Sequence, residues 1–463
     1  MKTLEYVENY NAYQPYMLLN FNLSFEKDIA HDDICRTVIE VVEEVNIARY
    51  VDFTNRNTHG YDGVMMFKLI MLAMADRGYV STRKLSKLCK TDIRYMFIAQ
   101  NQKPSHQAFQ RFIHDDLTMP IEDIFYEINK YIESKISINT DVLCIDGTKY
   151  EANANKNTFV WRANTIRNRT KRWKKVILCL KKINKYFAEQ NIALNYSLLK
   201  EPSIEYMLAV ADGIERYMKD YNIEFVHGKG KRKSNIQRLY DELKGHAIKL
   251  WEYAIHMELL GNRNSFSKTD PDATFMHMKY DYYNHTNVFK PGYNVQIGVS
   301  DGYIRNIYIS SDGNDLRTYI PFMEKYKSAY GTLPKKTPAD AGYGSYDNYM
   351  YCLKNGMELV MKYPMYAKKK EAKYKKQTYN PANWETDEEG YKVRPEGKRF
   401  DQYLSDRIDE SGVYPRIIQR VTSQEECSGC PRKSECCKSK SGRKILSRDV
   451  VLNEFYQKVD ENL

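Results

Sequence analysis

The hydrophobic pattern of this chain changes near residue 139, and that change constrains the fold more than any other feature. Up to that point apolar residues recur at helical spacing, as in Thr37–Val51. The segment Asp141–Asp146 (DVLCID) is instead a near-continuous apolar run between turn residues, which is typical of a strand buried on both faces. The pattern predicts a helical N-terminal domain followed by an α/β domain.

Strand patterns return after a long charged stretch that reads as helical. Gly292–Ser300 and Tyr303–Ser310 flank an Asp-Gly pair and predict a hairpin. A helix, the short strand Thr337–Asp340, another helix and the strand Met357–Tyr363 follow. The order strand, hairpin, helix, strand, helix, strand predicts a mixed sheet whose first strand is followed by a long insertion.

These patterns divide the chain into six segments. They are a helical N-terminal, DNA-binding domain, a first core strand with its aspartate, a basic helical insertion, the rest of the core, a Lys- and Tyr-rich insertion with a cysteine cluster, and the start of a C-terminal helix. In the same order they cover residues 1–138, 139–162, 163–265, 266–365, 366–446 and 447–463.

Composition narrows the choice of partner and compartment. Lys and Arg number 71 against 60 Asp and Glu, a net charge of +11 that favours nucleic acid, although an ordinary basic enzyme fits the composition equally well. The most apolar stretch, Val64–Ala75, is interrupted by Lys68 and is shorter than the roughly 20 residues of a membrane span. Residues Met1–Tyr16 lack the apolar region of a signal peptide. We expect a protein of the reducing cytoplasm with no membrane partner.

Two aspartates stand where predicted strands end. Asp146 precedes Gly147, and Asp340 precedes the sequence Ala-Gly-Tyr-Gly. Ligands and metals gather at strand ends in α/β sheets, and a set of carboxylates suits Mg²⁺ or Mn²⁺. Such a site activates a nucleophile and stabilises the leaving oxygen of a phosphodiester. The alternative is that each Asp only caps a turn ahead of a glycine.

Several motifs resemble those of DDE transposases from bacterial insertion sequences. Cys144–Arg162 (CIDGTKYEANANKNTFVWR) is similar to the first-acid segment of the branch whose acid lies in Asp-Gly-Thr. The family's later landmarks and its helical N-terminal domain are matched in order by Thr269–Lys279, Lys290–Gln296, Pro338–Ser345, Gly78–Leu85 and Lys103–Phe112. The resemblance covers nearly the whole chain and implies a ribonuclease H-like catalytic core.

The resemblance also implies roles for individual residues. Asp146 and Asp340 match the first two acids, which hold two Mg²⁺ ions. The family's third acid is a Glu in a Tyr-x2-Arg-x3-Glu-x6-Lys signature, and no segment matches it. The nearest approach, Tyr403, Arg407 and Glu410, has the wrong spacing and precedes the cysteines. We therefore expect a C-terminally truncated and catalytically impaired transposase, an expectation that sequencing the source DNA past the last codon would check.

Basic runs supply candidate DNA contacts. Residues 162–185 carry ten Lys or Arg and no acid, and lysines and arginines neutralise phosphates. A solvated helix face is the alternative. Two short basic helices at residues 81–117 also allow a helix-turn-helix, or equally an ordinary helical bundle. The residues we expect to contact DNA are Arg167, Arg169, Lys171, Arg172, Lys174 and Lys175.

Four cysteines crowd into CSGCPRKSECC. Cys427, Cys430 and Cys436 fit a Cys-x2-Cys-x5-Cys loop often present in the similar family, with Cys437 as the extra, and a zinc site is one interpretation. Structural thiols without metal are an equally weighted alternative.

Three functions compete at this point. The leading one is a transposase that binds terminal repeats and target DNA as a homodimer, cleaves them and transfers strands, in a bacterial cytoplasm and on the nucleoid when bound. The others are a host nuclease of the ribonuclease H type and a non-catalytic DNA-binding remnant or regulator. Metal dependence of cleavage and dependence on a terminal repeat distinguish the three.

Overall fold

The computed structural model divides the chain into two compact units, Met1–Ile138 and Asn139–Leu463. The segment Met1–Tyr16, where we expect no signal peptide, lies outside the described residues. No described helix is both long enough and apolar enough to cross a membrane. The structure describes residues 25–50, 60–228, 230–278, 288–423, 427, 429–437, 439 and 442–463.

The first unit is helical, as its apolar spacing predicts. Ser81 and Ser105 are the N-caps of α4 and α6, where each hydroxyl accepts a hydrogen bond from a backbone N–H in the first turn. The buried faces of the helices meet in one core that includes Leu69, Phe109 and Phe112. Its elements are α1 (Phe25–Asp28), α2 (Ile34–Glu44), η1 (Ile47–Arg49), α3 (Gly63–Arg77), α4 (Thr82–Thr91), α5 (Ile93–Ile98), α6 (His106–Arg111), the π-helix η2 (Phe112–Leu117) and α7 (Ile121–Lys135).

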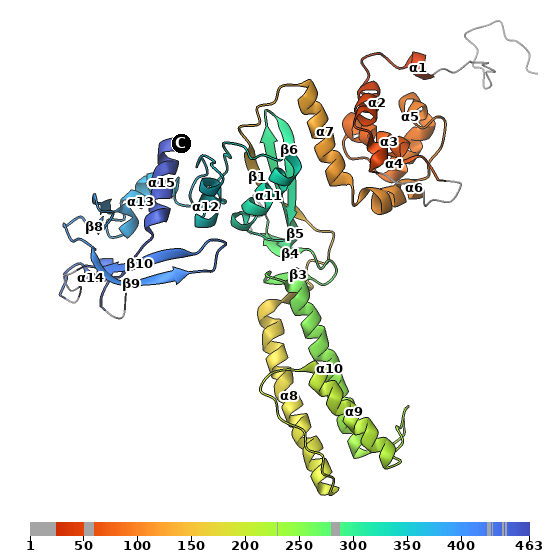
Figure 1. The fold of residues 1–463 in the computed structure, drawn as a ribbon, viewed down its shortest axis with the longest axis vertical. Helices are drawn as coiled ribbons and strands as arrows, with labels where there is room; N and C mark the ends of the chain where they lie inside the picture. The colour runs from red at the N-terminus through yellow and green to blue at the C-terminus, as the bar shows by residue number, and fades with distance from the viewer. Residues whose placement is uncertain are drawn as a thin grey trace, which may run out of the picture. The chain divides into compact units, whose positions relative to one another are not determined.

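The second unit is built on a mixed sheet (Figure 1). Strand β1 (Cys144–Glu151) pairs antiparallel with β5 (Phe289–Ser300), and β5 pairs with both β4 (Thr274–His277) and β6 (Tyr303–Ser310). The β5–β6 hairpin turns through Asp301 and Gly302, both at positive φ, as an Asp-Gly turn requires. The predicted hairpin is therefore confirmed.

On its other side β1 runs parallel to two short segments. Ile145 bridges Ala339, and Ala339 bridges Met361. The predicted strands at Thr337–Asp340 and Met357–Tyr363 are thus reduced to isolated bridges. Pro338 has no N–H to donate to β1, which interrupts the ladder on that side. The order β6, β5, β1, 336–339, 358–361 is that of a ribonuclease H-like sheet, and the predicted α/β fold class is confirmed.

Helices cover the core face of this sheet. Leu143, just before β1, and Ile145 of β1 lie in one buried cluster with Tyr319 and Phe322, and Phe455 of α15 joins the same cluster. A helix predicted from Asn314 to Tyr330 is split into a 3-10 turn and an α-helix. The covering elements are η3 (Asp315–Arg317), α11 (Tyr319–Tyr330), α12 (Tyr346–Lys354) and α15 (Val450–Asn462).

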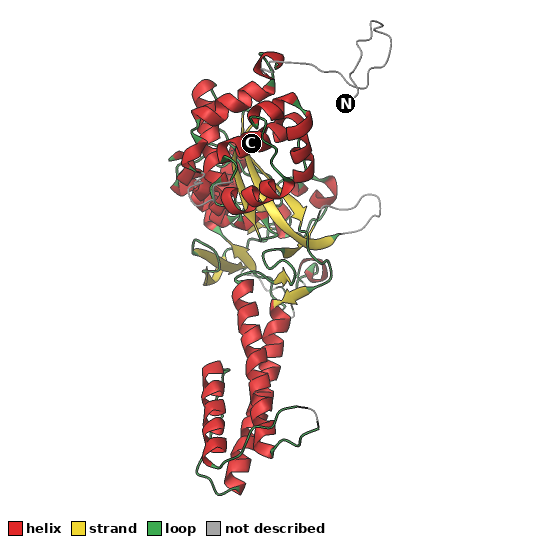
Figure 2. Cartoon of the chain, turned by 90° about the vertical axis from the view of Figure 1, so that its right-hand side faces the viewer, coloured by secondary structure: helices red, strands yellow, loops and turns green. Residues whose placement is uncertain are grey.

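The predicted helical insertion is three helices with a core of their own. Helices α8 (Arg162–Glu189) and α9 (Ile204–Asp220) both pack against α10 (Asn235–Leu260). They are the group of helices at the lower end of Figure 2. Strand β2 (Phe159–Trp161) pairs with β3 (Ser265–Ser267), which brings the two ends of the insertion together. A bundle whose ends meet can be inserted after β1 without opening the sheet.

The segment after residue 366 contains more regular structure than its composition predicts. Strands β9 (Gln402–Asp409) and β10 (Arg416–Thr422) form a hairpin, to which β11 (Leu446–Arg448) adds. Tyr403 and Arg407 lie on β9 and so do not belong to a third-acid helix. The small elements of this segment are η4 (Lys368–Lys370), α13 (Ala372–Lys375), η5 (Pro381–Asn383), β7 (Glu385–Thr386), β8 (Lys392–Val393) and α14 (Lys433–Cys436).

Candidate active site

The parallel pairing beside β1 brings the two predicted acids together. Ile145 and Ala339 are bridge partners, so the residues that follow them, Asp146 and Asp340, occupy equivalent positions on neighbouring strands. Strands lie about 4.8 Å apart and successive side chains alternate between faces. Because Ile145 and Ala339 contribute to the core, Asp146 and Asp340 project from the opposite, solvent-exposed face.

Each aspartate also caps a turn, as the simpler interpretation predicts. Asp146 Oδ1 accepts a hydrogen bond from the backbone N–H of Gly147 (2.8 Å), and Asp340 Oδ1 accepts one from Gly342 (2.8 Å). Each cap engages one carboxylate oxygen. Within the described residues, no hydrogen bond or ion pair engages the second oxygen of either side chain, so capping and cation binding are compatible.

A buried polar layer lies next to these acids. The buried face of β5 carries Asn294 and Gln296, although apolar residues are usual at such positions. Gln296 Nε2 donates to Asn294 Oδ1 (2.9 Å), and the hydroxyl of the fully buried Tyr343 donates to Gln296 Oε1. Burying an amide without a partner would cost about 1–3 kcal/mol, and this network avoids that cost.

A third carboxylate, missed by the sequence analysis, completes the layer. Asp315 begins η3 and is half-buried; its Oδ1 accepts hydrogen bonds from Asn294 Nδ2 (2.7 Å) and Gln296 Nε2 (3.1 Å). Two amides at alternate positions of a buried strand face do indicate that a polar partner lies opposite. Nothing in the sequence identifies that partner as Asp315.

The electrostatics of this sheet end are strongly negative. Burial, followed by the charges of Asp315, Asp146 and Asp340, raises the pKa of the Tyr343 hydroxyl well above its usual range. Among the residues that the structure describes, no Lys or Arg forms an ion pair with any of these three carboxylates. A site of this kind attracts a cation.

The donor set fits a hard divalent cation. Mg²⁺ is usually held by one or two carboxylates together with waters and substrate phosphates, and Asp146 and Asp340 provide two. Within the described part of the chain, no group of three or more His, Cys, Asp or Glu side chains is placed to hold a metal ion. Two carboxylates are the number that such a cation takes from the protein when waters and substrate phosphates complete its coordination.

Two family models match the chain. The model for the Transposase DDE domain matches residues 265–426, and that for the Transposase domain (DUF772) matches residues 23–115. The chain belongs to the insertion-sequence DDE transposases. The predicted family is therefore confirmed, and with it a role in transposition and DNA recombination. Comparisons with curated proteins and with solved structures give no match.

The family models cover only part of the candidate site. Asp315, Asp340 and the polar residues of β5 lie inside the Transposase DDE domain, whereas Asp146 lies outside both matches. The helical insertion also falls outside them. For this transposase, the pairing of Asp146 with Asp340 rests on the register of the sheet.

The predicted DNA-contacting residues all lie on α8. Arg167, Arg169, Lys171, Lys174 and Lys175 are exposed, and none forms an ion pair with an acid of the described residues. Arg172 differs, because it is half-buried and its guanidinium lies 3.3 Å from His246 Nδ1 of α10. Five of the six predicted cations are thus exposed on this helix of the transposase, and the sixth contributes to the bundle.

The predicted zinc site is not supported. All four cysteines of the cluster are described, yet no metal-holding group is found among the described residues. Cationic side chains occupy the positions near the thiols. Arg394 Nη1 lies 3.4 Å from Cys430 Sγ, and Lys444 Nζ lies 3.6 Å from Cys436 Sγ. Hydrogen bonding from Arg394 lowers the pKa of the Cys430 thiol. Two cations beside the sulfurs are unfavourable neighbours for Zn²⁺.

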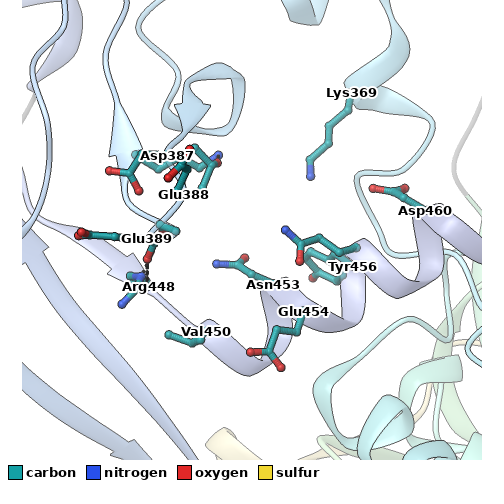
Figure 3. A pocket seen from close by; sticks show the side chains of 14 residues that line it. Lys369, Asp387, Glu388, Glu389, Arg448, Val450, Asn453, Glu454, Tyr456 and Asp460 are labelled. Carbon is teal, nitrogen blue, oxygen red and sulfur yellow. Dashed lines mark hydrogen bonds between the residues drawn. The ribbon is translucent and has the colours of Figure 1, made fainter.

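A separate cavity of about 430 Å³ lies along α15 of the transposase. Figure 3 shows Lys369 extending toward the helix face that carries Asn453 and Tyr456. Burial lowers the pKa of Lys369, and Arg448 Nη2 donates to the Glu389 carbonyl (2.6 Å) at the cavity wall. Neither Asp146 nor Asp340 lines this cavity, so it is not part of the candidate active site.

Proposed function

We propose that this transposase binds transposon-end and target DNA and catalyses divalent-cation-dependent strand cleavage and strand transfer, with Asp146 and Asp340 as its catalytic acids. The observation that carries the proposal is the register that pairs Ile145 with Ala339 and aligns the two acids. The match to the Transposase DDE domain over residues 265–426 supports it, because Asp340 lies inside that range.

Each residue of the site has a defined task. Asp146 and Asp340 would hold Mg²⁺ or Mn²⁺ through the oxygens that the backbone caps leave available. A bound divalent cation activates water or a 3′-hydroxyl and stabilises the leaving 3′-oxygen. The N–H groups of Gly147 and Gly342 orient the carboxylates, and the buried amides behind them limit how far this sheet end can move.

Five exposed cations in the first half of α8 are the proposed contacts to DNA phosphates: Arg167, Arg169, Lys171, Lys174 and Lys175. Phosphate contacts by Lys and Arg give affinity that is independent of sequence and falls with salt. The N-terminal helices α4 and α6 pack against each other and are the second proposed DNA contact. Because two transposon ends are cut together, we expect at least a homodimer on DNA.

A cleavage assay tests the catalytic part of the proposal. The full chain is incubated with a supercoiled plasmid that carries the element's own ends, with Mg²⁺ or Mn²⁺ and with EDTA. Because no segment matches the family's third acid, we expect cation-dependent cleavage at the ends to be weak, and we expect Asp146→Asn and Asp340→Asn each to abolish it. Asp312→Asn, an acid outside the site, is the matched control and should cleave like the parent chain.

Two results would overturn the catalytic proposal. One is cleavage that survives Asp146→Asn and Asp340→Asn, which would indicate a different site or a contaminating nuclease. The other is specific binding to the ends with no cleavage under any cation. That second result would favour the non-catalytic DNA-binding regulator.

A further inference from the structure

Asp315 is an acid whose position the two-carboxylate scheme does not explain. Its Oδ1 is fixed by two buried amides, those of Asn294 and Gln296. No hydrogen bond or ion pair within the described residues engages its Oδ2. The carboxylate is therefore held rigidly by one oxygen while the other remains free.

The free oxygen faces the candidate site. A Cβ atom placed on Gly342 would lie 3.3 Å from Asp315 Oδ2 and 2.9 Å from Asp340 Oδ1. The two oxygens therefore border the same small space. A Cβ placed on Gly147, the neighbour of Asp146, would lie 3.1 Å from Asp315 Oδ1. Asp315 thus lies beside Asp340, across Gly342, and reaches β1 at Gly147, the residue that follows Asp146. The charges of all three acids act on the Tyr343 hydroxyl.

A fixed negative charge at this position destabilises the cation-free site and favours the cation-bound one. Like charges repel, and three carboxylates at one sheet end without a cationic side chain raise the free energy of the cation-free site. A divalent cation between Asp146 and Asp340 removes that repulsion. A carboxylate close to the ligands attracts the cation through its charge. Losing an outer-shell group that hydrogen-bonds a metal ligand typically costs about 10–100-fold, which gives the scale of the effect expected here.

We infer that Asp315 is a positioning residue of the cation site: its carboxylate, anchored by Asn294 and Gln296, strengthens divalent-cation binding by Asp146 and Asp340 without belonging to that pair. The inference rests on the proposed function, since it concerns the same cation. The inference gives the buried amides of β5 a second role. Besides hydrogen-bonding to each other, they hold the Asp315 carboxylate in place.

Cation binding by the full chain is the test, with no need for cleavage. Mn²⁺ is titrated in and the free ion is followed by its electron paramagnetic resonance signal. We expect Asp315→Asn, which keeps the shape and removes the charge, to weaken Mn²⁺ binding by about 10- to 100-fold. Asp315→Glu, which restores the charge, should recover part of that affinity. The matched control is Asp312→Asn, three residues earlier, whose carboxylate pairs with Arg317; it should bind Mn²⁺ like the parent.

The outcomes distinguish a failure of the inference about Asp315 from a failure of the proposed cation site at Asp146 and Asp340. If Asp146→Asn weakens Mn²⁺ binding but Asp315→Asn does not, the inference is wrong and the proposed function stands. If Asp146→Asn and Asp340→Asn both bind like the parent, the proposed site itself is wrong. A purely structural role would lower the melting temperature of Asp315→Asn and leave the affinity unchanged, which also overturns the inference. Should Asp315→Asn fail to fold, Asp315→Ser provides the same comparison.

Discussion

The sheet end around Asp146 and the bundle of α8, α9 and α10 differ in both surface charge and core composition. The sheet end is acidic on its surface and polar in its interior, where Asn294 and Gln296 replace apolar residues. The bundle is basic on its surface and has an ordinary apolar core that includes Ile183 and Phe187. The exposed cations of the bundle therefore lie over an ordinary apolar core. The carboxylates of the sheet end lie over buried amide side chains that hydrogen-bond to one another and to Asp315.

The largest expected effect is on the stability of the bundle, and it tests whether the bundle can be destabilised without changing cation binding at the sheet end. Phe187 is fully buried in the bundle and meets Tyr217 edge to face, with ring centroids 5.0 Å apart. Phe187→Ala should destabilise the bundle by about 3–5 kcal/mol and leave Mn²⁺ affinity unchanged, because the bundle and the sheet have separate cores. Hydrogen exchange of α8–α10 with a parallel Mn²⁺ titration measures both.

The control for this change is Leu178→Ala on the same helix, where the side chain is 58% exposed and the cost should stay within about 0.5 kcal/mol. Loss of Mn²⁺ binding in Phe187→Ala would show that the two regions are coupled.

The second prediction concerns the surface of the bundle. The triple change Arg167→Gln, Lys171→Gln and Lys174→Gln should weaken DNA binding by at least about tenfold, because fewer phosphates are neutralised. The slope of log affinity against log salt should become shallower by about 0.9 for each phosphate that the variant no longer neutralises. Electrophoretic mobility shifts at several salt concentrations measure both quantities.

The matched control removes three lysines further along α8. Lys182 and Lys185 already pair with Glu242 and Glu189, so changing them with Lys181 to Gln should alter DNA affinity less. Equal effects from the two triple changes would mean that total charge matters and its position on α8 does not.

The third prediction tests how tightly the polar scaffold is packed. A Cβ on Gly147 would lie 2.7 Å from Gln296 Nε2, whose amide is hydrogen-bonded and fully buried. Gly147→Ala should therefore cost about 1–3 kcal/mol of unfolding free energy and weaken Mn²⁺ binding. Urea denaturation and the Mn²⁺ titration check this. Gly313→Ala, whose Cβ would meet only Met276 Cγ at 3.5 Å, should be close to neutral; equal costs at both positions would refute the packing argument.

The smallest expected effect is a pH dependence of the bundle. Burial lowers the pKa of His246, helped by the charges of Arg172, Lys175 and Lys182 and opposed by Glu242. The unfolded chain therefore binds a proton first as pH falls through about 6.5, and the bundle loses stability from there down to the lowered folded pKa. The slope should not exceed about 1.4 kcal/mol per pH unit. His246→Gln should flatten it and the exposed His227→Gln should not, as thermal unfolding at several pH values would report.

Much of the fold was predictable because local physics decides it. Ser81 and Ser105 begin helices since their hydroxyls cap the first turn, and Asp301-Gly302 closes a hairpin since both residues accept positive φ. The β9–β10 hairpin was missed because both strands carry charged residues and β9 is largely exposed, so no buried face imposes a regular alternation there. The zinc interpretation is not supported among the described residues. Cysteine spacing says nothing of the Arg394 guanidinium that lies beside Cys430.

The sequence by itself determined the candidates: two aspartates at strand ends, a basic helix and the family to which their motifs belong. Only the tertiary structure decided which residues meet. Ile145 and Ala339 become neighbours through strand register, and Asp315 reaches Gln296 through a turn after β6. Local propensity depends on residues a few positions apart and can be read from their order. Convergence of distant residues depends on how the whole core packs, because register and burial are set by all the contacts at once.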